Sequence, residues 1–150
     1  MSKNKQYTEK DLDGPTAFSF DGTVTLSING TNVAIPISAI GHINFDGKGK
    51  ATSATRIFNF GGAVILKQVA HGEYQVNPDG TGSARFEVST QEVTGTLPPG
   101  VQLPGIGVET FVFVLTQSNE LKFIGTGMFD IDSGQPLAAV TARGTLHSQQ

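Results

Sequence analysis

The chain contains no cysteine and no tryptophan, and charged residues make up only 15% of its 150 residues. Without cysteine it can form no disulfide bond, thiolate nucleophile or cysteine-ligated zinc site. The charged fraction lies below the roughly 25% that is usual in soluble domains. The formal net charge is −3 and the basic residues are scattered singly, so we do not expect the chain to bind nucleic acid.

Long hydrophobic runs are also missing. The longest uninterrupted one, Phe111 to Leu115, is far too short to cross a bilayer, so we expect no membrane association. The first 13 residues are polar and lack the apolar core of a secretory signal. These absences favour a cytoplasmic protein. The length is typical of one domain, and we assign residues 1–14 to a flexible N-terminal arm and 15–150 to a single domain.

Alternation of apolar and polar residues, interrupted by turn signals, recurs along the rest of the chain and is typical of β-strands. The Asn29-Gly30 pair, for example, predicts a tight hairpin turn because both residues tolerate positive φ. The predicted strands cover about 18–26, 33–45, 51–60, 64–76, 82–89, 109–116, 120–128 and 138–147. Eight strands with short links predict an all-β fold, an eight-stranded antiparallel up-and-down β-barrel.

The inward phase of these strands mixes glycine and alanine with large rings. A barrel of this size is either filled by side chains or holds one small ligand. We interpret the glycines as positions that leave empty space and the rings as the walls of a cavity. A solid core is the alternative. The predicted ligand-binding residues are Phe18, Phe20, Phe58, Phe86, Phe111, Phe113, Phe123 and Leu103.

Residues 91–107 form the one long predicted loop, which is rich in proline and glycine and also carries Leu97, Val101 and Leu103. Long loops in compact domains are often functional, and apolar side chains in a loop need a surface to cover them. We predict a lid over one mouth of the barrel. The alternative is a loop that packs permanently on the outer wall.

Three polar residues share a phase with apolar neighbours and are the candidate catalytic residues: Glu109, Tyr74 and Arg56. Glu109 could be a desolvated general acid or base, or a solvated carboxylate at the barrel rim. Tyr74 could point its hydroxyl group at a ligand or satisfy it on the backbone. Arg56 could bind a ligand carboxylate or oxyanion inside the barrel, or form an ion pair outside it.

We expect no metal and no cofactor. The Asp-Gly-x-Gly repeats at 46–49 and 79–82 lack the further carboxylates of a calcium site and are interpreted as turns. His42, His71 and His147 fall on the outward phase and are not spaced as ligands. No phosphate-binding loop or serine-hydrolase elbow is present.

Residues 45–49 and 72–82 resemble turns of small bacterial β-barrel proteins of the calycin and allene oxide cyclase-like type. The resemblance implies a central apolar pocket, which carries small lipophiles in calycins and folds a flexible substrate for ring closure in allene oxide cyclases. The chain departs from true lipocalins in lacking tryptophan, and hence their Gly-x-Trp motif. The resemblance assigns no catalytic residues in this chain.

We therefore expect the barrel to bind a small, largely apolar molecule in its interior. One alternative is a cofactor-independent cyclase or isomerase of natural-product biosynthesis that holds a flexible chain in a reactive fold. Another is a structural or interaction barrel with a filled core. A homodimer through an outer face is possible, with Val64, Ile65 and Val69 as candidate contacts.

Overall fold

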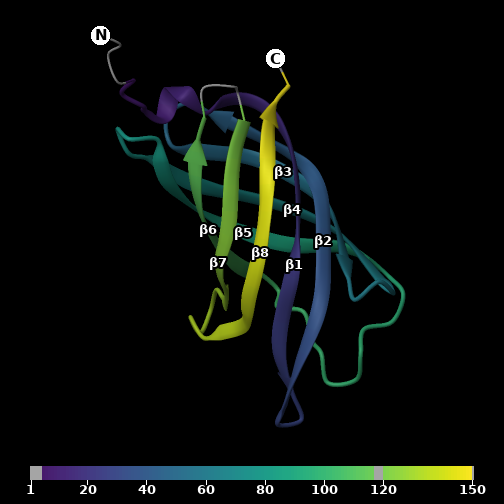
Figure 1. The fold of residues 1–150 in the computed structure, drawn as a ribbon. Coiled ribbons are helices and arrows are strands. Elements are labelled where there is room, and N and C mark those ends of the chain that lie inside the picture. The colour runs from purple at the N-terminus through teal and green to yellow at the C-terminus, as the bar shows by residue number, and fades with distance from the viewer. Residues whose placement is uncertain (1–4, 117–119, 150) are drawn as a thin grey trace.

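The computed structural model describes residues 5–116 and 120–149, whose strands form one closed antiparallel barrel (Figure 1). Each strand pairs with its sequence neighbours, and β8 pairs with β1 to close the ring. The strands are β1 (Asp13–Ile28), β2 (Thr31–Asp46), β3 (Lys50–Phe60), β4 (Val64–Val76), β5 (Thr81–Thr94), β6 (Gly107–Leu115), β7 (Glu120–Asp130) and β8 (Pro136–Ser148). The prediction of an eight-stranded up-and-down barrel is confirmed.

The described residues contain little helix. A single 3-10 turn, η1 (Glu9–Asp11), precedes β1, and Thr8 caps it through its side-chain oxygen. Nothing in the described ranges provides a helix with the length and apolarity needed to cross a membrane.

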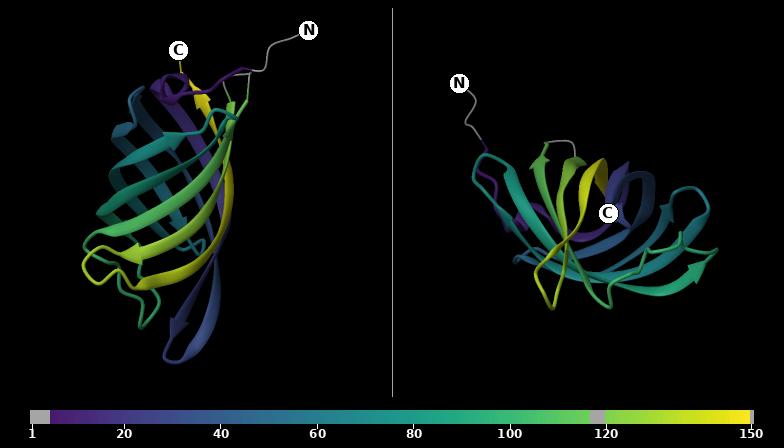
Figure 2. Two further views of the ribbon diagram at one scale, coloured as in Figure 1. Left: turned by 90° about the vertical axis from the view of Figure 1, so that its left-hand side faces the viewer. Right: turned by 90° about the horizontal axis from the view of Figure 1, so that it is seen from below.

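The β1–β2 hairpin turns at Asn29 and Gly30, whose φ angles are 52° and 81°. Two consecutive positive φ angles are those of the tight turn that the sequence predicts. The hairpin extends beyond the neighbouring strand β8, which pairs with β1 only between Thr16 and Thr25. Its tip therefore projects from the end of the barrel opposite to both termini (Figure 1; Figure 2, left).

Phenylalanine rings occupy the space that the inward glycines leave. A Cβ atom added to Gly72 would lie 2.9 Å from Cδ1 of Phe86, which is its cross-strand partner. The same relation joins three further pairs of cross-strand partners: Gly41 with Phe18, Gly82 with Phe113, and Gly144 with Phe123. Gly144 also faces the Cβ atom of its other partner, Phe20. Glycine lets the strands coil tightly, and a ring from the neighbouring strand covers it. These glycines are sites of close packing, which corrects their interpretation as empty space.

The interior side chains form two apolar clusters. The cluster at the end that holds the termini includes Leu12, Phe45, Tyr74 and Phe113. The other cluster includes Phe20, Val24, Phe58, Phe60 and Leu66. We call them the upper and lower clusters, because the end of the barrel that holds the termini is drawn at the top of Figure 1.

Residues 5–12 lie across the upper end of the barrel. The backbone N–H of Tyr7 donates to the carbonyl oxygen of Pro78 at 3.0 Å, and Leu12 is 5% exposed within the upper cluster. The first strand begins at Asp13, within the segment predicted as an arm. Residues 1–4 of that segment lie outside the described residues, and the flexibility of the arm stays a prediction.

The long loop begins later than predicted, because β5 continues through Thr94. Residues 92–94 pair with β4 beyond a bulge at Lys67 and Gln68, and the loop covers 95–106. The bulge could not be anticipated from alternation, which it interrupts. Another correction concerns the proposed dimer face: Val64 is 2% exposed and belongs to the lower cluster, so it cannot serve as an outer contact. The homodimer itself stays a prediction.

Candidate functional site

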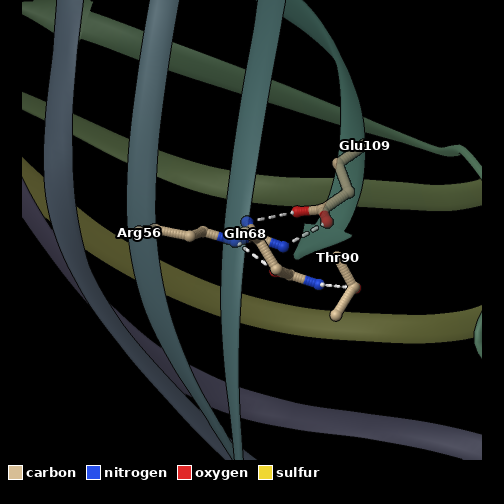
Figure 3. A network of polar contacts seen from close by, with 4 residues as sticks. All are labelled: Arg56, Gln68, Thr90 and Glu109. Carbon is tan, nitrogen blue, oxygen red and sulfur yellow. Dashed lines mark hydrogen bonds and ion pairs between the residues drawn. The ribbon is translucent and has the colours of Figure 1, made fainter. Parts of the chain in front are cut away.

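An ion pair lies inside the barrel, between residues of two strands that are not neighbours. Arg56 on β3 donates from Nη1 to Oε1 of Glu109 on β6 at 2.8 Å, and from Nη2 to Oε2 at 2.5 Å (Figure 3). The two parallel hydrogen bonds are the bidentate geometry that gives arginine–carboxylate pairs their strength and fixed orientation. Of the two placements that the sequence left open for Arg56, the structure has the inward one.

Gln68 and Thr90 extend this pair into a network of four side chains from four consecutive strands. Nε of Arg56 donates to Oε1 of Gln68 at 2.7 Å, and Nε2 of Gln68 donates to Oγ1 of Thr90 at 3.0 Å (Figure 3). The sequence analysis missed both residues, although the signal was present. Gln68 shares its phase with buried Leu66, and Thr90 shares its phase with buried Val88.

The ion pair is desolvated. Arg56 is 8% exposed and Glu109 is 7% exposed, so Glu109 is not a solvated rim carboxylate. The guanidinium carbon of Arg56 lies 4.8 Å from the ring centroid of Phe58 and 5.7 Å from that of Phe20, within the range of cation–π attraction. Both carboxylate oxygens of Glu109 accept guanidinium N–H bonds, so in this arrangement the group acts as an acceptor rather than as a proton donor.

Two cavities border Arg56 and Gln68, one toward each end of the barrel. The upper cavity has a volume of about 70 Å³. Its walls include six of the predicted ligand-binding residues: Phe18, Phe20, Phe86, Phe111, Phe113 and Phe123. A water molecule takes about 30 Å³ in the liquid, and an apolar cavity of about 150 Å³ holds benzene. The upper cavity is thus smaller than a benzene site.

The lower cavity, also of about 70 Å³, lies beneath the long loop. Leu103 and Pro104 of the loop form part of its wall, together with Phe58 and Glu109. Three apolar loop residues, Leu97, Val101 and Leu103, pack against the lower cluster. The loop therefore covers the lower end of the barrel interior (Figure 2, left) instead of packing on the outer wall.

Tyr74 borders the upper cavity, but its hydroxyl group is bound to the backbone. It donates toward the carbonyl oxygens of Leu12 at 2.7 Å and Glu9 at 3.0 Å. Burial raises the pKa of the Tyr74 phenol above its usual value, so the hydroxyl keeps its proton. The structure brings Arg56 and Glu109 together and leaves Tyr74 apart from them, as an attachment point for the N-terminal segment.

The remaining motifs have structural explanations. Asp46 Oδ1 accepts from the backbone N–H groups of Lys48 and Lys50, and Asp79 Oδ1 accepts from that of Thr81. The two backbone hydrogen bonds lower the pKa of Asp46, and the pKa of Asp79 is lowered first by a hydrogen bond from the Thr81 hydroxyl group at 2.6 Å and then by the backbone one. The three histidines are exposed. Within the described ranges, no group of three or more histidine, aspartate or glutamate residues is arranged to hold a metal ion.

Comparisons of the chain with protein-family models, with curated proteins and with solved structures give no match. The functional argument therefore depends on the chemistry of the barrel interior.

Proposed function

We propose that the barrel binds a small, largely apolar molecule in its interior and places a polar group of that molecule against Arg56. The observation that carries this proposal is a buried ion pair whose arginine borders two cavities with largely apolar walls. Well-packed hydrophobic residues usually stabilise a core at least as well as a buried ion pair does. A charged pair among phenylalanine rings is therefore better explained by ligand recognition than by stability.

Arg56 retains hydrogen-bonding capacity for a ligand. Three of its five N–H groups donate to Gln68 and Glu109, which leaves one N–H on each Nη atom. Within the part of the chain that the structure describes, no hydrogen bond uses those two groups. A carbonyl or hydroxyl oxygen in either cavity could accept one of them.

Binding requires the interior to open. Each cavity has about half the volume of one that holds benzene, so a molecule with a longer chain must displace side chains or the loop. Leu103 and Pro104 are the natural gate because they cover the lower cavity and belong to a loop rather than to a barrel strand. Motion of such loops commonly controls access to buried sites.

A calycin-type carrier accounts for these features better than an allene oxide cyclase-like enzyme does. Catalysis of ring closure would gain from a proton donor in the cavity. Here both oxygens of Glu109 accept hydrogen bonds and the hydroxyl group of Tyr74 is engaged by the N-terminal segment. We therefore propose passive binding or carriage.

The proposal is tested with octan-2-one, which combines an apolar chain with one carbonyl acceptor. Uniformly ¹⁵N-labelled protein is titrated and followed by two-dimensional NMR. We expect saturable one-to-one binding with shifts at the Arg56 Nε–H signal and at the backbone of residues 95–106. The signal is assigned with the Arg56→Met variant. Linear, non-saturating shifts, or shifts confined to the outer surface, would exclude an interior site.

A further inference from the structure

We infer that the interior site selects electrically neutral amphiphiles, and that hydroxyl-bearing ones bind better than carboxylates or amines of equal chain length. This inference rests on the proposed function and specifies the ligand class for the same site. It follows from the charges that border the two cavities and from the donors and acceptors that remain there.

The charge of Arg56 is already balanced inside the barrel. Both Nη atoms donate to the two carboxylate oxygens of Glu109, and the pair is almost fully buried. Among the described residues, the charged side chains bordering the upper cavity are limited to Arg56, and those bordering the lower cavity are Arg56 and Glu109. A ligand that enters therefore meets a polar centre whose net charge is zero.

An anionic headgroup fits this centre poorly. A carboxylate placed against Arg56 would also lie beside the carboxylate of Glu109, and like charges in a desolvated site repel strongly. To displace Glu109, the ligand would leave that carboxylate buried without a partner. An ammonium group would face the same difficulty with Arg56. The inference thus departs from the expectation that Arg56 binds a ligand carboxylate or oxyanion, because Glu109 already pairs with Arg56.

A hydroxyl group fits the centre well because it can donate and accept at the same time. Its oxygen can accept the remaining N–H of an Arg56 Nη atom. Its proton can point to a remaining lone pair of Glu109 or to Oγ1 of Thr90, both of which border the lower cavity. A ketone can make the first of these contacts alone, and an alkane can make neither. The expected order of affinity is alcohol, then ketone, then alkane, with both ions weakest.

The test compares five ligands of one chain length with the intact chain: octan-1-ol, octan-2-one, octane, octanoate and octylammonium. Affinities are measured near neutral pH by the NMR titration described above. We expect octan-1-ol to bind at least about tenfold more tightly than either ion, since like-charge contacts in a dry site are strongly unfavourable. Octanoate binding as tightly as octan-1-ol overturns the inference while leaving the proposed function intact. If none of the five binds saturably, the proposed function itself fails.

Two variants test the charge argument directly. In Glu109→Gln the charge of Arg56 is unbalanced, and the preference should invert so that octanoate binds more tightly than octan-1-ol. Because this variant leaves a buried charge without its partner and could unfold, Arg56→Met/Glu109→Leu provides a second measurement. This double variant should lose the preference of octan-1-ol over octane. Retention of the wild-type preference in either folded variant contradicts the inference.

Discussion

The guanidinium group of Arg56 on β3 meets the carboxylate of Glu109 on β6 across the inside of the barrel, 53 positions away in the chain. Neither strand pairs with the other, because β4 and β5 lie between them in the sheet. The contact is therefore made through the interior, at the level where the two cavities meet Gln68. Closure of the barrel creates it.

Replacing one member of this ion pair should lower the free energy of unfolding much more than replacing both members does. We expect Arg56→Met or Glu109→Leu alone to lower the free energy of unfolding by about 3–5 kcal/mol, because each leaves one buried charge unpaired. The double variant should recover about 3 kcal/mol relative to the sum of the single effects. Urea unfolding of the four proteins measures this coupling.

An outer ion pair supplies the matched control. Lys50 Nζ and Glu73 Oε1 are 2.6 Å apart, but their side chains are 58% and 67% exposed. The same substitutions, Lys50→Met and Glu73→Leu, should couple by less than about 1 kcal/mol, because water screens the charges. A coupling at the inner pair no larger than that at the outer pair would contradict the burial argument.

The phenylalanine–glycine pairs predict a steep cost for adding a single methyl group. In Gly144→Ala the new Cβ atom would overlap the carbonyl oxygen of Ser19 and lie 2.5 Å from Cβ of Phe20. Backbone atoms of β1 would have to shift. We expect a loss of about 1–3 kcal/mol in the free energy of unfolding, measured by urea titration.

Gly105→Ala is the control for this effect. No heavy atom lies within 4 Å of the position that its Cβ atom would take. We expect a change within about 0.5 kcal/mol for this exposed loop residue. Equal losses in the two variants would show that close packing of β8 on β1 is not the cause.

Alternation predicted the barrel because every second residue of a strand points to the interior. It also identified the inward phase of Arg56 and Glu109, since both residues interrupt apolar series. It could not pair them, because the pairing depends on register and closure over several strands. Gln68 carried the same signal as Arg56 and was missed, although it lies in phase with Leu66 and Tyr74.

The glycines show a second limit of reading one strand at a time. Gly72 leaves space beside its own backbone, and the alternation pattern says nothing about which neighbour fills it. Cross-strand register places Phe86 directly opposite, and its ring takes the space together with the carbonyl oxygen of Arg85. The volume of a barrel interior is thus a property of strand pairs, which a sequence without register does not specify.

The loop over the lower cavity should control the rate at which ligands enter. Leu103→Ala removes a side chain from the cavity wall, so octan-2-one should associate faster, on the order of tenfold. Exchange-broadened NMR line shapes during the titration give the rate constants. Ile106→Ala in the same loop is the control, because Ile106 is 39% exposed and should not change the rate. An equal effect of the two variants would mean that the loop does not form the gate.

Attachment of the N-terminal segment at Tyr74 should make stability fall at alkaline pH. Burial raises the pKa of this phenol above its usual value of 10.0 in the folded chain. As the pH rises through about 10, the unfolded chain therefore releases its proton first, and the folded chain binds more protons. The free energy of unfolding then decreases with pH until the folded-state pKa is passed. Urea unfolding from about pH 8 to about pH 11 measures the slope.

Tyr74→Phe separates this effect from other alkaline changes. The variant should lose about 1–2 kcal/mol near neutral pH, because the carbonyl oxygen of Leu12 loses its buried donor. Its stability should then fall less steeply above about pH 10 than that of the wild type. Tyrosinate absorbance provides a second readout, since the chain has only one other tyrosine, Tyr7. The contribution of Tyr74 to the wild-type absorbance change should be missing from the variant. Parallel alkaline losses in both proteins would show that the Tyr74 hydroxyl does not hold the N-terminal segment in place.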